Sequence, residues 1–98
     1  MKTPEGYEKA DIDKYLKLLV PDLYLLKPAS YGFGASGTSD RVGCYRSKFF
    51  AIEVKREGKE PTKLQWDRIN EVIAAGGTAF WGTAAKVIPE FEAWRTSL

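Results

Sequence analysis

The chain has 98 residues, of which 44% are hydrophobic and 29% charged, and its formal net charge is +2. These values are typical of one globular domain, and the small positive excess excludes a generic polycation, so nucleic-acid binding would need basic side chains gathered on one face. The chain has no histidine, which excludes Ser-His-Asp and Cys-His catalysis and His-ligated zinc.

The N-terminal segment predicts a helix followed by a strand. Thr3 is a candidate N-cap, Pro4 suits the first turn, and apolar residues recur at helical spacing, so we expect a helix over about residues 4–19 that Pro21 ends. Residues 23–27 are apolar enough for a strand, and a loop rich in glycine and serine follows at 29–39.

The central segment predicts a β-hairpin. Residues 41–45 and 49–55 form two strands, and the polar residues 46–48 connect them. Side chains alternate along a strand, so the second strand has two faces. One face carries Phe50, Ile52 and Val54; the other carries Phe49, Ala51, Glu53 and Lys55. We expect the first face to contact the core.

The C-terminal half predicts a helix, a strand and a last helix. Thr62 is an N-cap candidate after a charged loop, and Gly76-Gly77 ends the helix that follows. Residues 78–82 form a short strand, expected to lie parallel to 49–55 through a right-handed crossover. A last helix at about 84–98 is interrupted or begins at Pro89. The order αβββαβ(α) predicts an α/β fold with a mixed central sheet flanked by helices.

Two acidic residues point to a metal site. A hairpin that turns near Ser47 puts position 40 across from about position 54, so Asp40 should lie near Glu53. Two carboxylates placed together repel unless a cation lies between them, and Lys55 shares the face of Glu53. An isolated Glu-x-Lys is more often a solvated charged pair; the added Asp40 favours a site for a divalent metal and an activated water.

Three further polar residues are candidates for the same site. Gln65, in the first turn of its helix, could bind the attacking water or a phosphate, or could simply face solvent. Glu5 or Glu8 could supply a third carboxylate, and the alternative for each is compensation of the helix dipole.

Basic residues and glycines supply candidate DNA contacts, since glycines let backbone approach phosphate closely. A solvated face and a flexible turn are the alternatives. The candidates are Arg41, Arg46, Lys48, Arg56, Lys59, Lys63, Gly34 and Gly37. Core or subunit-interface positions are expected instead for Trp66, Phe80, Trp81 and Trp94.

Taken together, these motifs resemble the PD-(D/E)XK nuclease superfamily, and in particular small stand-alone VRR-NUC domains of phages and bacteria. The resemblance lies in Asp40, Glu53-x-Lys55 and Gln65 in αβββαβ order, and covers nearly the whole chain. The matching stretches are Gly37–Asp40, Phe49–Lys55, Pro61–Gln65 and Ala74–Gly77. Ser39 stands where the family commonly has proline, and the chain has no Val-Arg-Arg tripeptide.

The resemblance implies a restriction-endonuclease-like fold and a DNA endonuclease dependent on Mg²⁺ or Mn²⁺. Asp40, Glu53 and the Val54 carbonyl are then the expected metal ligands, with Lys55, Gln65 and Glu5 as catalytic residues. It also implies a homodimer that acts on four-way (Holliday) junctions. The alternatives are a flap-cutting, nicking or restriction-like endonuclease, or a catalytically silent DNA-binding or subunit module.

Other features indicate a cytoplasmic protein without membrane contact. The first residues lack the apolar stretch of a signal peptide, and no apolar run approaches the ~20 residues of a membrane span. Cys44 is the only cysteine, which favours a reducing compartment.

Overall fold

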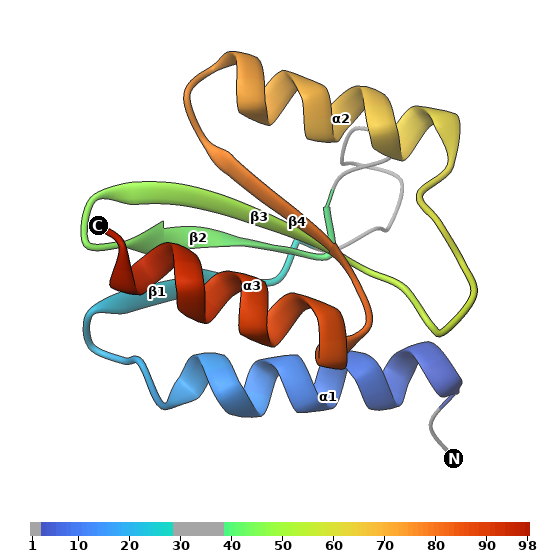
Figure 1. Ribbon diagram of the computed structural model, residues 1–98, viewed down its shortest axis with the longest axis horizontal. Helices are drawn as coiled ribbons and strands as arrows, with labels where there is room; N and C mark the ends of the chain where they lie inside the picture. The colour runs from blue at the N-terminus through green and yellow to red at the C-terminus, as the bar shows by residue number, and fades with distance from the viewer. Residues whose placement is uncertain (1–2, 29–38) are drawn as a thin grey trace.

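The computed structural model describes residues 3–28 and 39–98. Its elements, in chain order, are α1 (Pro4–Lys17), β1 (Leu23–Leu26), β2 (Arg41–Tyr45), β3 (Lys48–Val54), α2 (Lys63–Ala74), β4 (Thr78–Gly82) and α3 (Ala84–Thr96) (Figure 1). This is the predicted order. None of the described helices combines the length and apolar character that crossing a membrane requires.

The four strands form one mixed sheet in the order β1-β2-β3-β4. β1, β2 and β3 pair antiparallel, whereas β3 and β4 pair parallel, as predicted for a connection that passes through α2. The α/β class and the mixed sheet are therefore confirmed.

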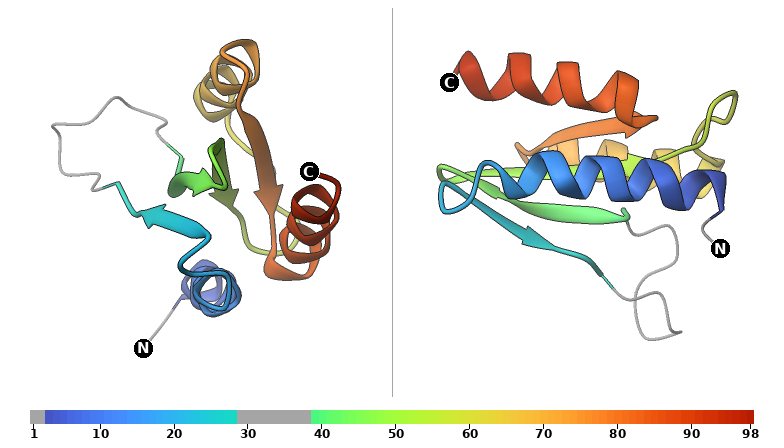
Figure 2. Two further views of the ribbon diagram at one scale, coloured as in Figure 1. Left: turned by 90° about the vertical axis from the view of Figure 1, so that its left-hand side faces the viewer. Right: turned by 90° about the horizontal axis from the view of Figure 1, so that it is seen from below.

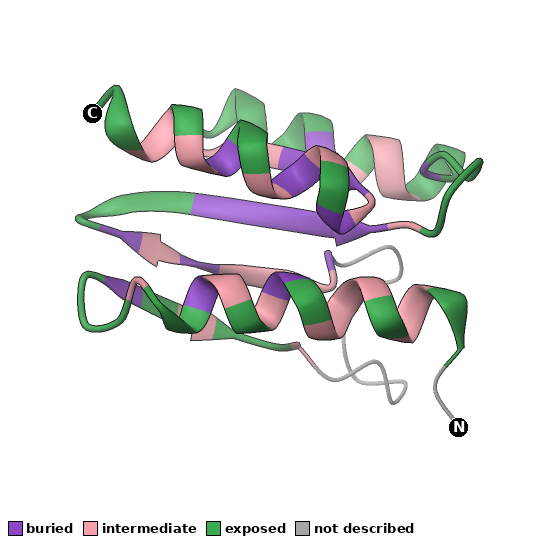
Figure 3. Cartoon of the chain, turned by 60° about the horizontal axis from the view of Figure 1, so that its bottom comes forward, coloured by how far each residue is buried: buried purple, intermediate pink, exposed green. Residues whose placement is uncertain are grey.

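Helices cover both faces of the sheet (Figure 2). α1 and α3 lie on one face, where the Phe91 and Phe50 rings pack edge-on with their centres 5.0 Å apart. α2 lies on the other face over β3 and β4, and Trp66 packs edge-on against Trp81 at 5.6 Å. β3 is consequently buried from Phe50 to Val54 (Figure 3).

The core confirms the expected inner face of β3, because Phe50, Ile52 and Val54 are fully buried. They pack with Ile12 and Leu16 of α1 and with residues of α3. Full burial of such a side chain contributes about 1.5–3 kcal/mol. This face fixes the strand whose opposite face carries Glu53.

Pro89 neither interrupts nor begins the last helix; α3 runs through it. A proline inside a helix costs about 3 kcal/mol, because a hydrogen bond is lost and the ring crowds the preceding turn. Val87 and Phe91 on either side of it are 1% and 0% exposed, and burial of two such side chains offsets this cost.

The hairpin register differs from the prediction by one residue. Arg46 and Ser47, both at positive φ, form a two-residue turn, so Arg41 pairs with Ile52. Extending this register by one residue puts Asp40 across from Glu53 rather than Val54.

Candidate active site

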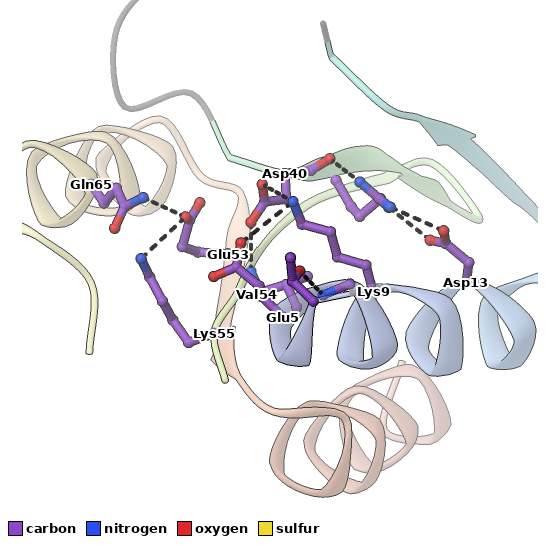
Figure 4. Close-up of polar contacts among 11 residues, drawn as sticks. Glu5, Lys9, Asp13, Asp40, Glu53, Val54, Lys55 and Gln65 are labelled. Carbon is purple, nitrogen blue, oxygen red and sulfur yellow. Dashed lines mark hydrogen bonds and ion pairs between the residues drawn. The ribbon is translucent and has the colours of Figure 1, made fainter. Parts of the chain in front are cut away.

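Asp40 and Glu53 share one face of the sheet at neighbouring strand positions. The Arg41–Ile52 pair sets this register, and directly opposed residues of antiparallel strands point to the same side. The Val54 backbone N–H donates a 2.9 Å hydrogen bond to Asp40 Oδ2, which ties the Asp40 carboxylate to β3 (Figure 4). The two acidic groups therefore converge, as the sequence predicts.

Glu53 is the buried member of the pair, only 3% exposed. Its Oε1 accepts a 2.6 Å hydrogen bond from Gln65 Nε2 and lies 3.9 Å from Lys55 Nζ. Its Oε2 is buried and has no hydrogen-bond partner among the described residues. A buried carboxylate oxygen left unpaired is costly, so this atom is suited to an external cation or proton.

Burial, then the charge of Asp40, raises the pKa of Glu53 to about 8, and Glu5 adds to the rise, whereas Lys55 opposes it. The ordinary value is 4.5. The raised pKa indicates that negative charge is crowded here and that the ionised form lacks full compensation. A divalent cation would supply that compensation.

Gln65 reaches the site but its amide is already engaged. As residue N3 of α2 it completes a capping box: its backbone N–H donates to Thr62 Oγ1 at 3.3 Å, and its Oε1 accepts from the Thr62 N–H at 2.9 Å. With its Nε2 on Glu53, both ends of the amide are in use. Its position suits holding Glu53 in place better than the predicted contact with water or phosphate.

The two N-terminal glutamates have different surroundings. Glu5 forms a 3.4 Å ion pair with Lys9 and contributes to the raised pKa of Glu53. Glu8 Oε1 instead accepts a 2.8 Å hydrogen bond from the Ala84 N–H, at the start of α3. The sequence leaves open whether Glu5 or Glu8 is the third carboxylate of the site. Glu5 fits this role better, because Glu8 caps α3.

The donor set fits a hard divalent cation. Carboxylate and carbonyl oxygens are the ligands of Mg²⁺, which usually keeps several waters and binds few protein groups. Within the described ranges, no three Asp, Glu, His or Cys side chains lie close enough together to hold a metal ion by themselves. Asp40, Glu53 and the Val54 carbonyl would therefore form part of the coordination shell, with water completing it.

The predicted basic residues are not gathered in one place. Arg46 and Lys48 lie at the turn end of β3, roughly 20 Å of strand away from Lys55. Arg41 has both Nε and Nη2 on the Asp13 carboxylate, at 2.7 and 3.0 Å, and its side chain is 11% exposed. Side chains alternate along the strand, so Arg41 points to the other side of the sheet from Asp40, and its guanidinium is engaged by Asp13 of α1.

Three basic candidates lie closer to the site. Arg56 and Lys59 line a surface hollow of about 550 Å³ that begins directly after Lys55 in the chain. Lys63, at the start of α2, is exposed and forms a 3.4 Å ion pair with Asp67. The remaining candidates, Gly34 and Gly37, lie outside the described residues.

The same hollow contains two residues that the sequence did not point to as DNA contacts, Trp81 and Lys86. Lys86 Nζ lies 4.0 Å from the Trp81 ring centre and donates a 2.6 Å hydrogen bond to the Trp81 carbonyl oxygen. Residues near the ends of β3 and β4 line this hollow, because these strands run parallel and end at the same edge. A parallel β3–β4 pair was predicted, but which side chains would share that edge was not.

Lys9 is the site residue that sequence reasoning missed. Its ammonium lies 3.4 Å from Glu5 Oε2 and 3.4 Å from Asp40 Oδ1. The four-residue spacing from Glu5 is a readable signal for the first contact, whereas the contact with Asp40 depends on how α1 packs on the sheet.

No protein-family model, curated protein or solved structure matches the chain.

Proposed function

We propose that this chain is a DNA endonuclease dependent on Mg²⁺ or Mn²⁺, with a restriction-endonuclease-like core, that cuts four-way junctions as a homodimer. One observation carries the proposal. Asp40 and Glu53 converge on one side of the sheet beside the Lys55 ammonium, and the Oε2 atom of Glu53 is buried without a partner in the described part of the chain. Packing alone gives no reason to bury such an atom.

Each residue has a role that its contacts support. Asp40, Glu53 and the Val54 carbonyl hold the cation, which supplies Lewis-acid activation of water and charge neutralisation at the phosphate. Lys55, with 12% of its side chain exposed, orients the attacking water and offsets phosphate charge. Gln65 keeps the Glu53 carboxylate in position. Glu5 contributes through a water at the rim of the site.

The expected substrate is DNA because basic groups lie where a phosphate backbone would leave the site. Arg56, Lys59 and Lys86 line the hollow next to Lys55 together with Glu57 and Glu60, so positive charge is in slight excess there, and Lys63 stands at the start of α2. Phosphate contacts release condensed counterions, so binding should weaken steeply as salt concentration rises.

A homodimer suits both the substrate and the surface of the protein. A four-way junction has approximate two-fold symmetry, and an isologous dimer presents two active sites with the same symmetry. Tyr24 and Phe49 are 69% and 47% exposed, and the pairing of both with Cys44 puts them on one face of the sheet. Exposed apolar side chains on one face are typical of a protein interface.

The testing experiment incubates the purified protein with a synthetic four-way junction, with Mn²⁺ or with EDTA. Wild type should cut only with the metal, and Lys55→Ala should reduce the rate by about 100-fold or more, as expected when a charge-stabilising group is lost. Lys14→Ala is the matched control, because Lys14 is an exposed lysine of α1. Junction binding and circular dichroism would establish whether Lys55→Ala is folded.

Different outcomes separate the candidate functions. Cutting of flaps, nicked duplexes or linear DNA in preference to the junction would replace the resolvase assignment with another endonuclease. DNA binding without cleavage under any metal would favour the silent module. Full cleavage by Lys55→Ala would remove the role given to that residue. A monomer at micromolar concentration in analytical ultracentrifugation would contradict the dimer.

A further inference from the structure

The Lys9 ammonium occupies an unusual position, between carboxylates of two different elements. It lies 3.4 Å from Glu5 Oε2, one turn earlier on α1, and 3.4 Å from Asp40 Oδ1, which precedes β2 (Figure 4). A surface pair between residues four apart on a helix needs no partner from the sheet. Here the lysine side chain joins the helix to the acidic group that the proposed nuclease needs.

The two oxygens of Asp40 are held by different groups. Oδ2 accepts the hydrogen bond of the Val54 N–H, which belongs to the strand and cannot move away without disrupting it. Oδ1 is held only by the flexible lysine side chain, among the contacts of the described residues. Oδ1 is therefore the Asp40 atom available to a cation, and Lys9 must leave it before the cation can bind.

The local charge supports the same conclusion. The carboxylates of Glu5 and Asp40 both lie against the Lys9 ammonium, and the strand register puts Asp40 across from Glu53, so negative charge is concentrated here. Lys9 offsets part of it with a single positive charge. A divalent cation at the same place would carry twice that charge and bind oxygen directly, whereas the ammonium and the metal would repel each other if both stayed.

We propose that Lys9 is an internal counter-ion of the cation site, which holds Asp40 and Glu5 together in the metal-free protein and competes with the divalent cation for them. The proposal rests on the proposed function, because it concerns the same carboxylates. It assigns Lys9 a positioning role that involves no contact with the reacting atoms. Its consequence is a metal-free site that is assembled before the metal arrives, at the cost of weaker metal affinity.

The test measures Mn²⁺ binding by isothermal titration calorimetry without DNA, at low salt, for wild type, Lys9→Met and Glu53→Gln. Methionine has an unbranched side chain only one heavy atom shorter than that of lysine, and it carries no charge. Ion pairs of this partial exposure are weakened by solvent, so Lys9→Met should bind Mn²⁺ only roughly twofold to tenfold more tightly. Glu53→Gln should bind at least about tenfold more weakly.

A second readout distinguishes competition from general stabilisation. The metal-free Lys9→Met protein should melt at a lower temperature than wild type, so that loss of one positive charge lowers stability and raises metal affinity together. Lys14→Met is the charge-matched control, since it removes an exposed lysine of the same helix. It should leave Mn²⁺ affinity within about twofold of wild type, because solvent screens exposed charges.

The outcomes separate the two proposals. Unchanged or weaker Mn²⁺ binding by folded Lys9→Met, with Glu53→Gln still impaired, overturns the role of Lys9 and leaves the cation site intact. Equal tightening in Lys9→Met and Lys14→Met also overturns it, because general charge would then be the cause. If neither wild type nor Lys9→Met binds Mn²⁺ at millimolar concentration, the proposed function fails as well. Lys9→Gln replaces the methionine variant if the latter does not fold.

Discussion

The buried carboxyl of Glu53 makes the stability of the metal-free protein depend on pH in an unusual direction. Burial and the charge of Asp40 raise the pKa of Glu53 to about 8, whereas the unfolded chain should titrate near its ordinary value of 4.5. Between these values the folded protein keeps a proton that the unfolded chain has lost. Stability must then fall as pH rises from about 4.5 through about 8, because the unfolded state binds fewer protons.

Glu53→Gln isolates this effect. The glutamine side chain is neutral at every pH, and its Oε1 can still accept the hydrogen bond that Gln65 Nε2 donates to Glu53. The difference between about 8 and 4.5, at 1.36 kcal/mol per pH unit, gives about 5 kcal/mol as an upper bound on the charge cost. Relaxation and water penetration reduce such a cost. We therefore expect the free energy of unfolding of Glu53→Gln to exceed that of wild type by about 3 kcal/mol at pH 9 and to differ little from it at pH 5.

Urea denaturation in EDTA, followed by tryptophan fluorescence and far-UV circular dichroism at intervals from pH 5 to pH 9, measures the gain. Similar denaturant slopes for the two proteins would license a direct comparison of unfolding free energies. Glu57→Gln, which removes an exposed carboxylate, controls for the change in net charge. If the difference in unfolding free energy between Glu53→Gln and wild type stayed constant over this range, or grew toward low pH, the raised pKa of Glu53 could not be its cause.

Two further predictions concern packing and capping. A Cβ on Gly43 would collide with the Tyr24 carbonyl oxygen and lie 2.9 Å from the Phe50 ring, so Gly43→Ala should lower the free energy of unfolding by about 3 kcal/mol or more. Gly58 has open space around it, so Gly58→Ala should lower the free energy of unfolding by only about 1 kcal/mol. Thermal melts measure both losses, and equal losses would contradict this prediction. Glu8→Ala removes the acceptor of the Ala84 N–H, so it should lower the free energy of unfolding in urea by about 1–2 kcal/mol and leave DNA cleavage unchanged. Glu5→Ala should instead slow cleavage and leave stability nearly unchanged. Impaired cleavage by a folded Glu8→Ala would make Glu8 the third carboxylate of the site.

The elements of the fold were predictable because their signals are local. Thr3 and Thr62 cap helices in the structure, and the alternation of Phe50, Ile52 and Val54 identifies the buried face of β3. Pro89 was misread because a local rule against proline in helices takes no account of the tertiary burial around it. Local rules therefore gave the order of the elements and failed where packing decides.

Arg41 shows how a local list of basic residues misleads. Arg41 was predicted to contact DNA because it is one of several basic residues that lie near the proposed site along the chain. Side chains alternate along a strand, so a residue next to Asp40 must face the opposite side of the sheet if Asp40 faces Glu53. The structure has this arrangement, with the guanidinium on Asp13 of α1. The alternation was available from the sequence, but Asp13 as the partner was not.

The register of the hairpin is the step on which the site depends, and no turn signal in the sequence specifies it. Arg46 and Ser47 both adopt positive φ, where glycine or asparagine is usual, so the two-residue turn was not apparent. A shift of one residue would put Asp40 against Val54 on the core face and separate it from Glu53. Gly43 permits the observed pairing, because it lies opposite Phe50, where any Cβ would meet the aromatic ring and the Tyr24 carbonyl oxygen. The register that puts the two carboxylates on the same side of the sheet therefore requires a residue without a side chain at position 43.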